Sequence, residues 1–66
     1  MLTLAEARRS CEAIRKSIDE REIMLQTAKA TKDEAGIRRI VEAIRNERVL
    51  LATREQVVAL LAAKEP

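Results

Sequence analysis

The sequence predicts an all-α protein, an antiparallel hairpin of two long helices that dimerises into a four-helix bundle. Three features of the composition predict this fold. The 66 residues include one Gly and one Pro, 36% of them are charged, and none is Phe, Trp or Tyr. Few helix breakers and many charges are typical of coiled coils and long helical hairpins. The whole chain, residues 1–66, is therefore expected to form a single domain.

The first helix is expected over about residues 3–30. Thr3 is followed three residues later by Glu6, which is the spacing of a capping box. Beyond this cap, a stripe with alternating steps of three and four residues predicts a helix that packs along its whole length. The stripe contains Leu4, Ala7, Cys11, Ile14, Ile18, Arg21, Leu25 and Ala28.

The chain is expected to reverse direction at about residues 29–36 and to continue as a second helix over about residues 32–63. Two starts of this helix remain open. Thr31 has a Glu three residues later, as in a capping box, and Asp33 is the alternative cap. Gly36 falls inside the helix under either alternative, where it costs about 1 kcal/mol relative to Ala.

The second helix carries two adjacent apolar stripes, each interrupted by charge near its middle. One stripe contains Ile37, Val41, Ile44, Arg48, Leu51, Glu55, Val58 and Ala62. The other contains Ile40, Ala43, Glu47, Leu50, Arg54, Val57 and Leu61. Together they form a face wider than one partner helix can cover. In the folded hairpin, residues whose numbers add to about 65 are expected to lie opposite each other.

The small size of the core predicts an obligate homodimer. Chains below about 70 residues rarely obtain more than about 3–5 kcal/mol from one core, and in a two-helix ribbon every core residue keeps one side in water. A second copy would cover the wide face of the second helix. The expected dimer interface contains Ile40, Leu50, Val57, Leu60 and Leu61.

A polar interruption is expected at the middle of the seam, formed by Arg21, Glu47 and Arg48. One interpretation is an ion-pair network that fixes the register of the helices. The other is a pair of arginines that clamps a carboxylate or a phosphate.

Catalysis is not expected, and we predict no catalytic residue, no cofactor and no metal site. The sequence contains no His, so the commonest general base and metal ligand is missing. Cys11 is the lone cysteine and is expected to fill the seam as a small apolar residue. No Gly-rich phosphate loop is present. These features together predict a non-enzymatic protein.

Location and partners follow from charge and hydropathy. No apolar run is long enough to cross a bilayer, and the N-terminus lacks the pattern of a secretory signal. With a single cysteine, these features predict a cytoplasmic protein without membrane contact. The net charge is +2, and acids and bases alternate along the chain, which favours solvated helix faces over a nucleic-acid footprint.

The preferred interpretation is therefore a small protein–protein interaction module, an adaptor or inhibitor that resembles, in size and type, those encoded by bacteria and their phages. Candidate contacts with a partner are Ile23 and Met24, an exposed apolar spot, and Arg8, Arg15 and Arg45. One alternative is an RNA-binding helical dimer, similar to Rop in size and architecture, which would use the arginines. Another is a structural or assembly component of a larger particle.

Overall fold

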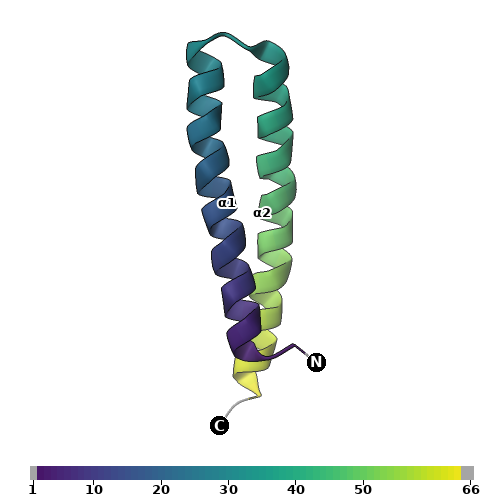
Figure 1. Ribbon diagram of the computed structural model, residues 1–66. Helices are drawn as coiled ribbons and strands as arrows, with labels where there is room; N and C mark the ends of the chain where they lie inside the picture. Colours follow the sequence, from purple (N-terminus) through teal and green to yellow (C-terminus); the bar gives the residue numbers. More distant parts are fainter. Residues whose placement is uncertain (1, 65–66) are drawn as a thin grey trace.

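The computed structural model describes residues 2–64 as two long helices packed against each other in a hairpin. Helix α1 spans Leu4–Ala30 and helix α2 spans Glu34–Ala63. They lie side by side, with the connection at one end of the molecule and both termini at the other (Figure 1). The hairpin measures 52 × 16 × 14 Å. The prediction of an all-α hairpin is confirmed.

Thr3 caps the N-terminus of α1, as the sequence predicts, but Glu6 accepts from the hydroxyl of Thr3 and not from its backbone N–H as in a capping box. Thr3 has an extended backbone, and its Oγ1 accepts a hydrogen bond from the backbone N–H of Glu6 at 3.1 Å. The Thr3 hydroxyl also donates to Oε1 of Glu6 at 2.9 Å. The cap satisfies one of the backbone donors that have no partner within the helix, which stabilises its first turn.

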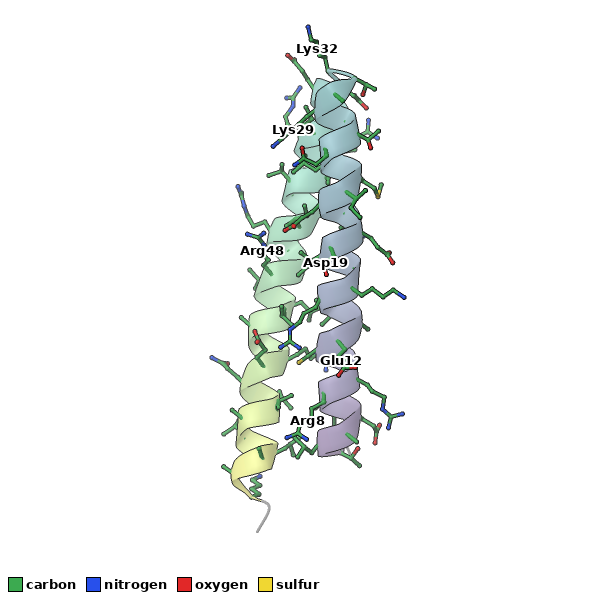
Figure 2. All side chains as sticks on the ribbon, turned by 90° about the vertical axis from the view of Figure 1, so that its left-hand side faces the viewer. Arg8, Glu12, Asp19, Lys29, Lys32 and Arg48 are labelled. Atoms are coloured by element: carbon green, nitrogen blue, oxygen red, sulfur yellow. The ribbon has the colours of Figure 1, made fainter. Side chains whose placement is uncertain are left out.

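The end of α1 is a Schellman motif, in which the chain turns through a left-handed residue. The N–H of Asp33 donates to the carbonyl of Ala28 at 3.0 Å, and the N–H of Lys32 donates to the carbonyl of Lys29 at 3.2 Å. Lys32 has a φ of 57°, a conformation that usually belongs to Gly. Lys32 lies at the tip of the hairpin in Figure 2.

Asp33, not Thr31, caps α2. Oδ1 of Asp33 accepts from the backbone N–H of Gly36 at 3.0 Å, and the helix begins at Glu34. The hydroxyl of Thr31 is used at the end of α1, where it donates to backbone carbonyl groups of that helix. The alternative with Thr31 and Glu34 as a capping box is therefore wrong, and α2 starts two residues later than residue 32.

The core is a narrow seam between the helices. Among residues 2–64, five hydrophobic residues are buried, namely Ala7, Cys11, Ile18, Ala28 and Ile44. The two isoleucines are the largest of them, and each is 7% exposed. Burial of one such side chain stabilises the fold by about 1.5–3 kcal/mol. Several large apolar side chains, among them Val49, Leu50 and Leu60, remain exposed outside this small core.

Candidate functional site

An ion pair lies in the middle of the seam, between Arg21 of α1 and Glu47 of α2. Nε of Arg21 is 2.5 Å from Oε1 of Glu47, and the same oxygen accepts from the hydroxyl of Ser17 at 3.0 Å. Glu47 thus lies between Ser17 and Arg21, which agrees with the expected register, in which residue 47 faces residue 18. The Glu47 side chain is 19% exposed, and its Oε2 is buried without a hydrogen-bond partner within residues 2–64.

Arg48, in contrast, lies outside the seam. Its side chain is 63% exposed, and its Nη2 donates to Oε1 of Glu22 at 2.9 Å. Arg21 and Arg48 therefore bind different carboxylates and do not converge on one anion site. The expected seam position of Arg48 is wrong because the residues of α2 that face α1 are drawn from both predicted stripes.

One side of the hairpin, which we call the charged flank, is defined by the positions that border the seam beside Arg48. They are Arg8, Arg15, Glu22 and Lys29 of α1 with Val41, Arg48, Glu55 and Ala62 of α2. Ion pairs cross this flank from Arg48 to Glu22 and from Arg15 to Glu55, the latter at 3.1 Å. All four side chains are about half exposed, so each pair contributes roughly 0.2–1 kcal/mol. Arg8 and Arg48 reach to the same side of the hairpin in Figure 2.

A groove of about 660 Å³ lies on the charged flank, in the half of the hairpin near the tip. Its apolar lining includes Leu25, Val41 and Val49, and its basic lining consists of Arg45 and Arg48. Val49 is 64% exposed and Val41 is 38% exposed. The groove therefore combines apolar contact area with basic side chains.

The opposite side, which we call the uncharged flank, differs in chemistry. The positions that border the seam there are the cap residue Thr3, then Ser10, Ser17 and Met24 of α1, with Gly36, Ala43, Leu50 and Val57 of α2, and none is charged. A shallow groove of about 280 Å³ on this flank is lined by Ser10, Ala13, Ile14, Ser17, Glu47, Leu50 and Arg54. In this groove, three small side chains of α1 and Ile14 thus face the larger side chains of Glu47, Leu50 and Arg54 of α2.

The residues expected at a dimer interface gather on the uncharged flank. Leu50 and Val57 border the seam there, Ile40 and Leu61 are the adjacent seam positions, and Leu60 lies at the outer edge. Leu50 is 44% exposed and Leu60 is 65% exposed. Leu50 and Val57 thus border the seam on this flank, with Ile40 and Leu61 beside them and Leu60 further around α2.

The residues expected to contact a partner are divided between surfaces. Arg45 lines the groove near the tip, and Arg8 and Arg15 line a second groove of about 390 Å³ on the charged flank, nearer the termini. Ile23 and Met24 are both exposed, as expected, at 69% and 53%. Successive residues of a helix are about 100° apart. Ile23 therefore lies on the outer surface of α1, and Met24 lies on the uncharged flank.

Arg54 belongs to the second stripe predicted for α2, and the structure places it at the edge of the seam beside the uncharged flank. It forms no ion pair with another residue between positions 2 and 64. The uncharged row through Ser10 and Ser17 was not predicted. Its spacing of seven residues in α1 is the signal that could have identified it.

Comparison of the chain with known protein families, curated proteins and solved structures gives no match. Among residues 2–64, no group of three or more potential metal ligands comes together. Neither helix is long and apolar enough, over the described residues, to cross a membrane. The candidate site is therefore a pair of unlike surfaces on one helical hairpin.

Proposed function

We propose that this protein is a small non-enzymatic protein–protein interaction module. In this proposal, two hairpins pair through their uncharged flanks into a four-helix bundle, and the charged flanks bind another protein. The module acts as an adaptor or inhibitor by occupying a surface of that protein. Cys11 is a free, buried thiol, which suits a reducing compartment, and we place the module in the cytoplasm.

The observation that carries the dimer is the apolar character of the second half of α2. Between residues 49 and 63, the charged residues are Arg54 and Glu55 alone. A helix that is apolar on most sides is typically buried on most sides. Helix α1 covers one side of it, and Leu50 and Leu60 remain 44% and 65% exposed. A second copy would cover part of this area and enlarge a core whose largest buried side chains are two isoleucines.

Sedimentation of two neighbouring variants tests the dimer. The unaltered chain is expected to sediment with twice the mass of one 7.4 kDa chain. Leu50→Asp places a charge on the uncharged flank and should yield a monomer or an unfolded chain. Val49→Asp, the matched control on the other side of α2, should remain dimeric. A compact, helical monomer of the unaltered chain at micromolar concentration would overturn the proposal.

The partner that fits the charged flank is an amphipathic helix with acidic residues beside its apolar stripe. Val41 and Val49 offer apolar contact in the groove, and Arg45 and Arg48 offer positive charge. The acid that lines this groove, Glu22, is paired with Arg48. Such helix-in-groove contacts are a common mode of recognition between proteins.

Capture experiments with two altered baits test this surface. Val49→Asp should keep the dimer and lose a stoichiometric protein partner from the native host, because it places an acid in the groove. Ile23→Asp, on the outer surface of α1, should retain that partner. Loss of the partner with Ile23→Asp alone would move the binding surface to α1. If both variants retained the partner, the charged flank would not be the binding surface.

RNA binding is the second candidate, because several arginines lie on one flank. Arg8 and Arg45 form no ion pair with another residue of the described chain. Arg15 and Arg48, however, are paired with carboxylates across the seam. If RNA is the ligand, its affinity should fall steeply with salt and should drop with Arg45→Glu. Absence of binding to RNA at low salt would eliminate this candidate.

A further inference from the structure

We infer that the two hairpins pair antiparallel, tips at opposite ends, with a two-fold axis close to Leu50, so that Glu47 of each copy faces Arg54 of the other. This inference rests on the proposed dimer and adds its orientation and its central contact. Four features of the hairpin support it. They are the order of charges along α2, the unpaired groups of Glu47 and Arg54, the small residues Ser10 and Ser17 on α1, and the groove that Ile14 and Leu50 share.

The seam residues of α2 form a row whose charges complement those of the same row read in reverse. Ile40, Glu47, Arg54 and Leu61 follow one another at seven-residue spacing, which is about two helical turns, so they share one face. In chemical terms their order is apolar, acidic, basic and apolar. When a second α2 lies antiparallel on this face, centred near Leu50, Ile40 meets Leu61 and Glu47 meets Arg54. Every contact is then complementary, and each occurs twice, as in an isologous interface.

The two charged members of this row have unused bonding capacity within one chain. Oε1 of Glu47 accepts both of its hydrogen bonds, and Oε2 is buried with no partner among the described residues. Arg54 forms no ion pair within residues 2–64, although it lines the same groove as Glu47. The terminal torsion of a Glu side chain has a broad energy minimum, so the carboxylate can turn toward a new donor. Arg54 of a second copy supplies that donor.

The residues of α1 on this flank allow close approach at the same level. Ser10 and Ser17 are equally spaced about a point next to Ile14, so in the antiparallel dimer each Ser10 faces Ser17 of the second copy. Small side chains at such positions let helices approach closely. Ile14 and Leu50 line the same groove. A single two-fold axis through that groove therefore allows the contacts of both helices. At this axis, the exposed Leu50 packs against Leu50 of the second copy.

A parallel dimer, with both tips at the same end, does not use these groups. In that orientation α2 faces α1 of the second copy, and residues at equal heights meet. Arg54 would then lie level with Ser10 and Cys11, and the nearest carboxylate of α1 on this side, that of Glu6, lies about one helical turn away and accepts from the hydroxyl of Thr3. The parallel arrangement thus gives Arg54 no carboxylate at its own level, whereas the antiparallel arrangement gives it Glu47.

Cross-linking through introduced cysteines tests the orientation. In a Cys11→Ala background, Leu50→Cys should be cross-linked into a covalent dimer by a short bismaleimide, because the two thiols meet at the axis. Val49→Cys, the neighbouring residue at 64% exposure, should not be cross-linked under the same conditions. In a parallel dimer the two Leu50→Cys thiols are diagonally opposed and out of reach.

The outcomes separate this inference from the proposed function. A dimer by sedimentation without cross-linking through Leu50→Cys overturns the antiparallel arrangement and leaves the dimer standing. Equal cross-linking through Val49→Cys would indicate random collision and would also overturn it. A monomer by sedimentation overturns both.

A charge reversal tests the contact between Glu47 and Arg54. Arg54→Glu brings two acids together at both symmetric contacts, so the dissociation constant of the dimer should rise at least about tenfold. Arg45→Glu, which makes the same change on the charged flank, should leave dimerisation within about twofold. Equal effects of the two variants would show that net charge, not this contact, governs pairing, and would refute the contact.

Discussion

Arg21 and Glu47 form an ion pair inside a seam that is otherwise mostly apolar, with Nε 2.5 Å from Oε1. The side chains are 38% and 19% exposed, so this pair is more shielded from water than either pair on the charged flank. Ser17 adds a second hydrogen bond to the same carboxylate. We expect the pair to favour one register of the helices, because a shift of either helix would separate a shielded charge from its partner.

Arg21→Met is expected to lower the free energy of unfolding by about 1.5–3 kcal/mol, because it leaves the shielded Glu47 carboxylate without its cation. Urea denaturation at one fixed protein concentration measures this change. Arg48→Leu is the control, since the exposed pair with Glu22 is worth less than about 1 kcal/mol. If Arg48→Leu destabilised the protein as much as Arg21→Met, burial would not explain the difference between the pairs.

Lys32→Gly is expected to stabilise the protein by about 1 kcal/mol, since Gly adopts a positive φ without the strain that a side chain brings. The thermal unfolding midpoint should rise. Lys16→Gly, in the middle of α1, removes the same side chain from a regular helix and should cost about 1 kcal/mol. A drop in stability with Lys32→Gly would contradict the left-handed conformation at the tip.

Asp33 and Gly36 are expected to act as a coupled pair. Asp33→Ala removes the cap of α2 and should cost about 0.5–2 kcal/mol. A Cβ on Gly36 would lie 2.8 Å from Cγ of Asp33, so Gly36→Ala must displace the cap. This loss should offset the gain of about 1 kcal/mol in helix propensity.

In the Asp33→Ala background, Gly36→Ala should instead be stabilising, because no carboxylate remains to be displaced. A double-mutant cycle by denaturation measures this coupling. Additive effects of the two substitutions would mean that the cap and the glycine act independently.

The unfolding midpoint is expected to depend on protein concentration if folding and dimerisation are linked. A rise of about a hundredfold in concentration should raise the midpoint of the unaltered chain, because mass action favours the dimer. Circular dichroism at several concentrations measures this shift. The midpoint of Leu50→Asp should be low and independent of concentration. An invariant midpoint for the unaltered chain would argue that the hairpin is stable alone.

The sequence by itself determined the two helices, the place where the chain reverses and the packing stripe of α1. These features follow from local rules. Breakers are rare, Thr3 precedes Glu6 at capping distance, and the apolar residues of α1 form one narrow stripe that leaves a single choice of face. The buried positions of α1, which include Cys11 and Ile18, fall on that stripe.

The tertiary structure alone decided which face of α2 meets α1 and how the two sides of the hairpin differ. The apolar residues of α2 extend around much of its circumference, so periodicity could not choose between Glu47 and Arg48 as the seam residue. The choice of cap between Thr31 and Asp33 depended on where α1 ended, which is a property of the turn as a whole. Only the packed pair of helices placed Ser17 and Arg21 of α1 beside Glu47 of α2, because the seam and its flanks are formed by two helices and belong to neither sequence segment alone.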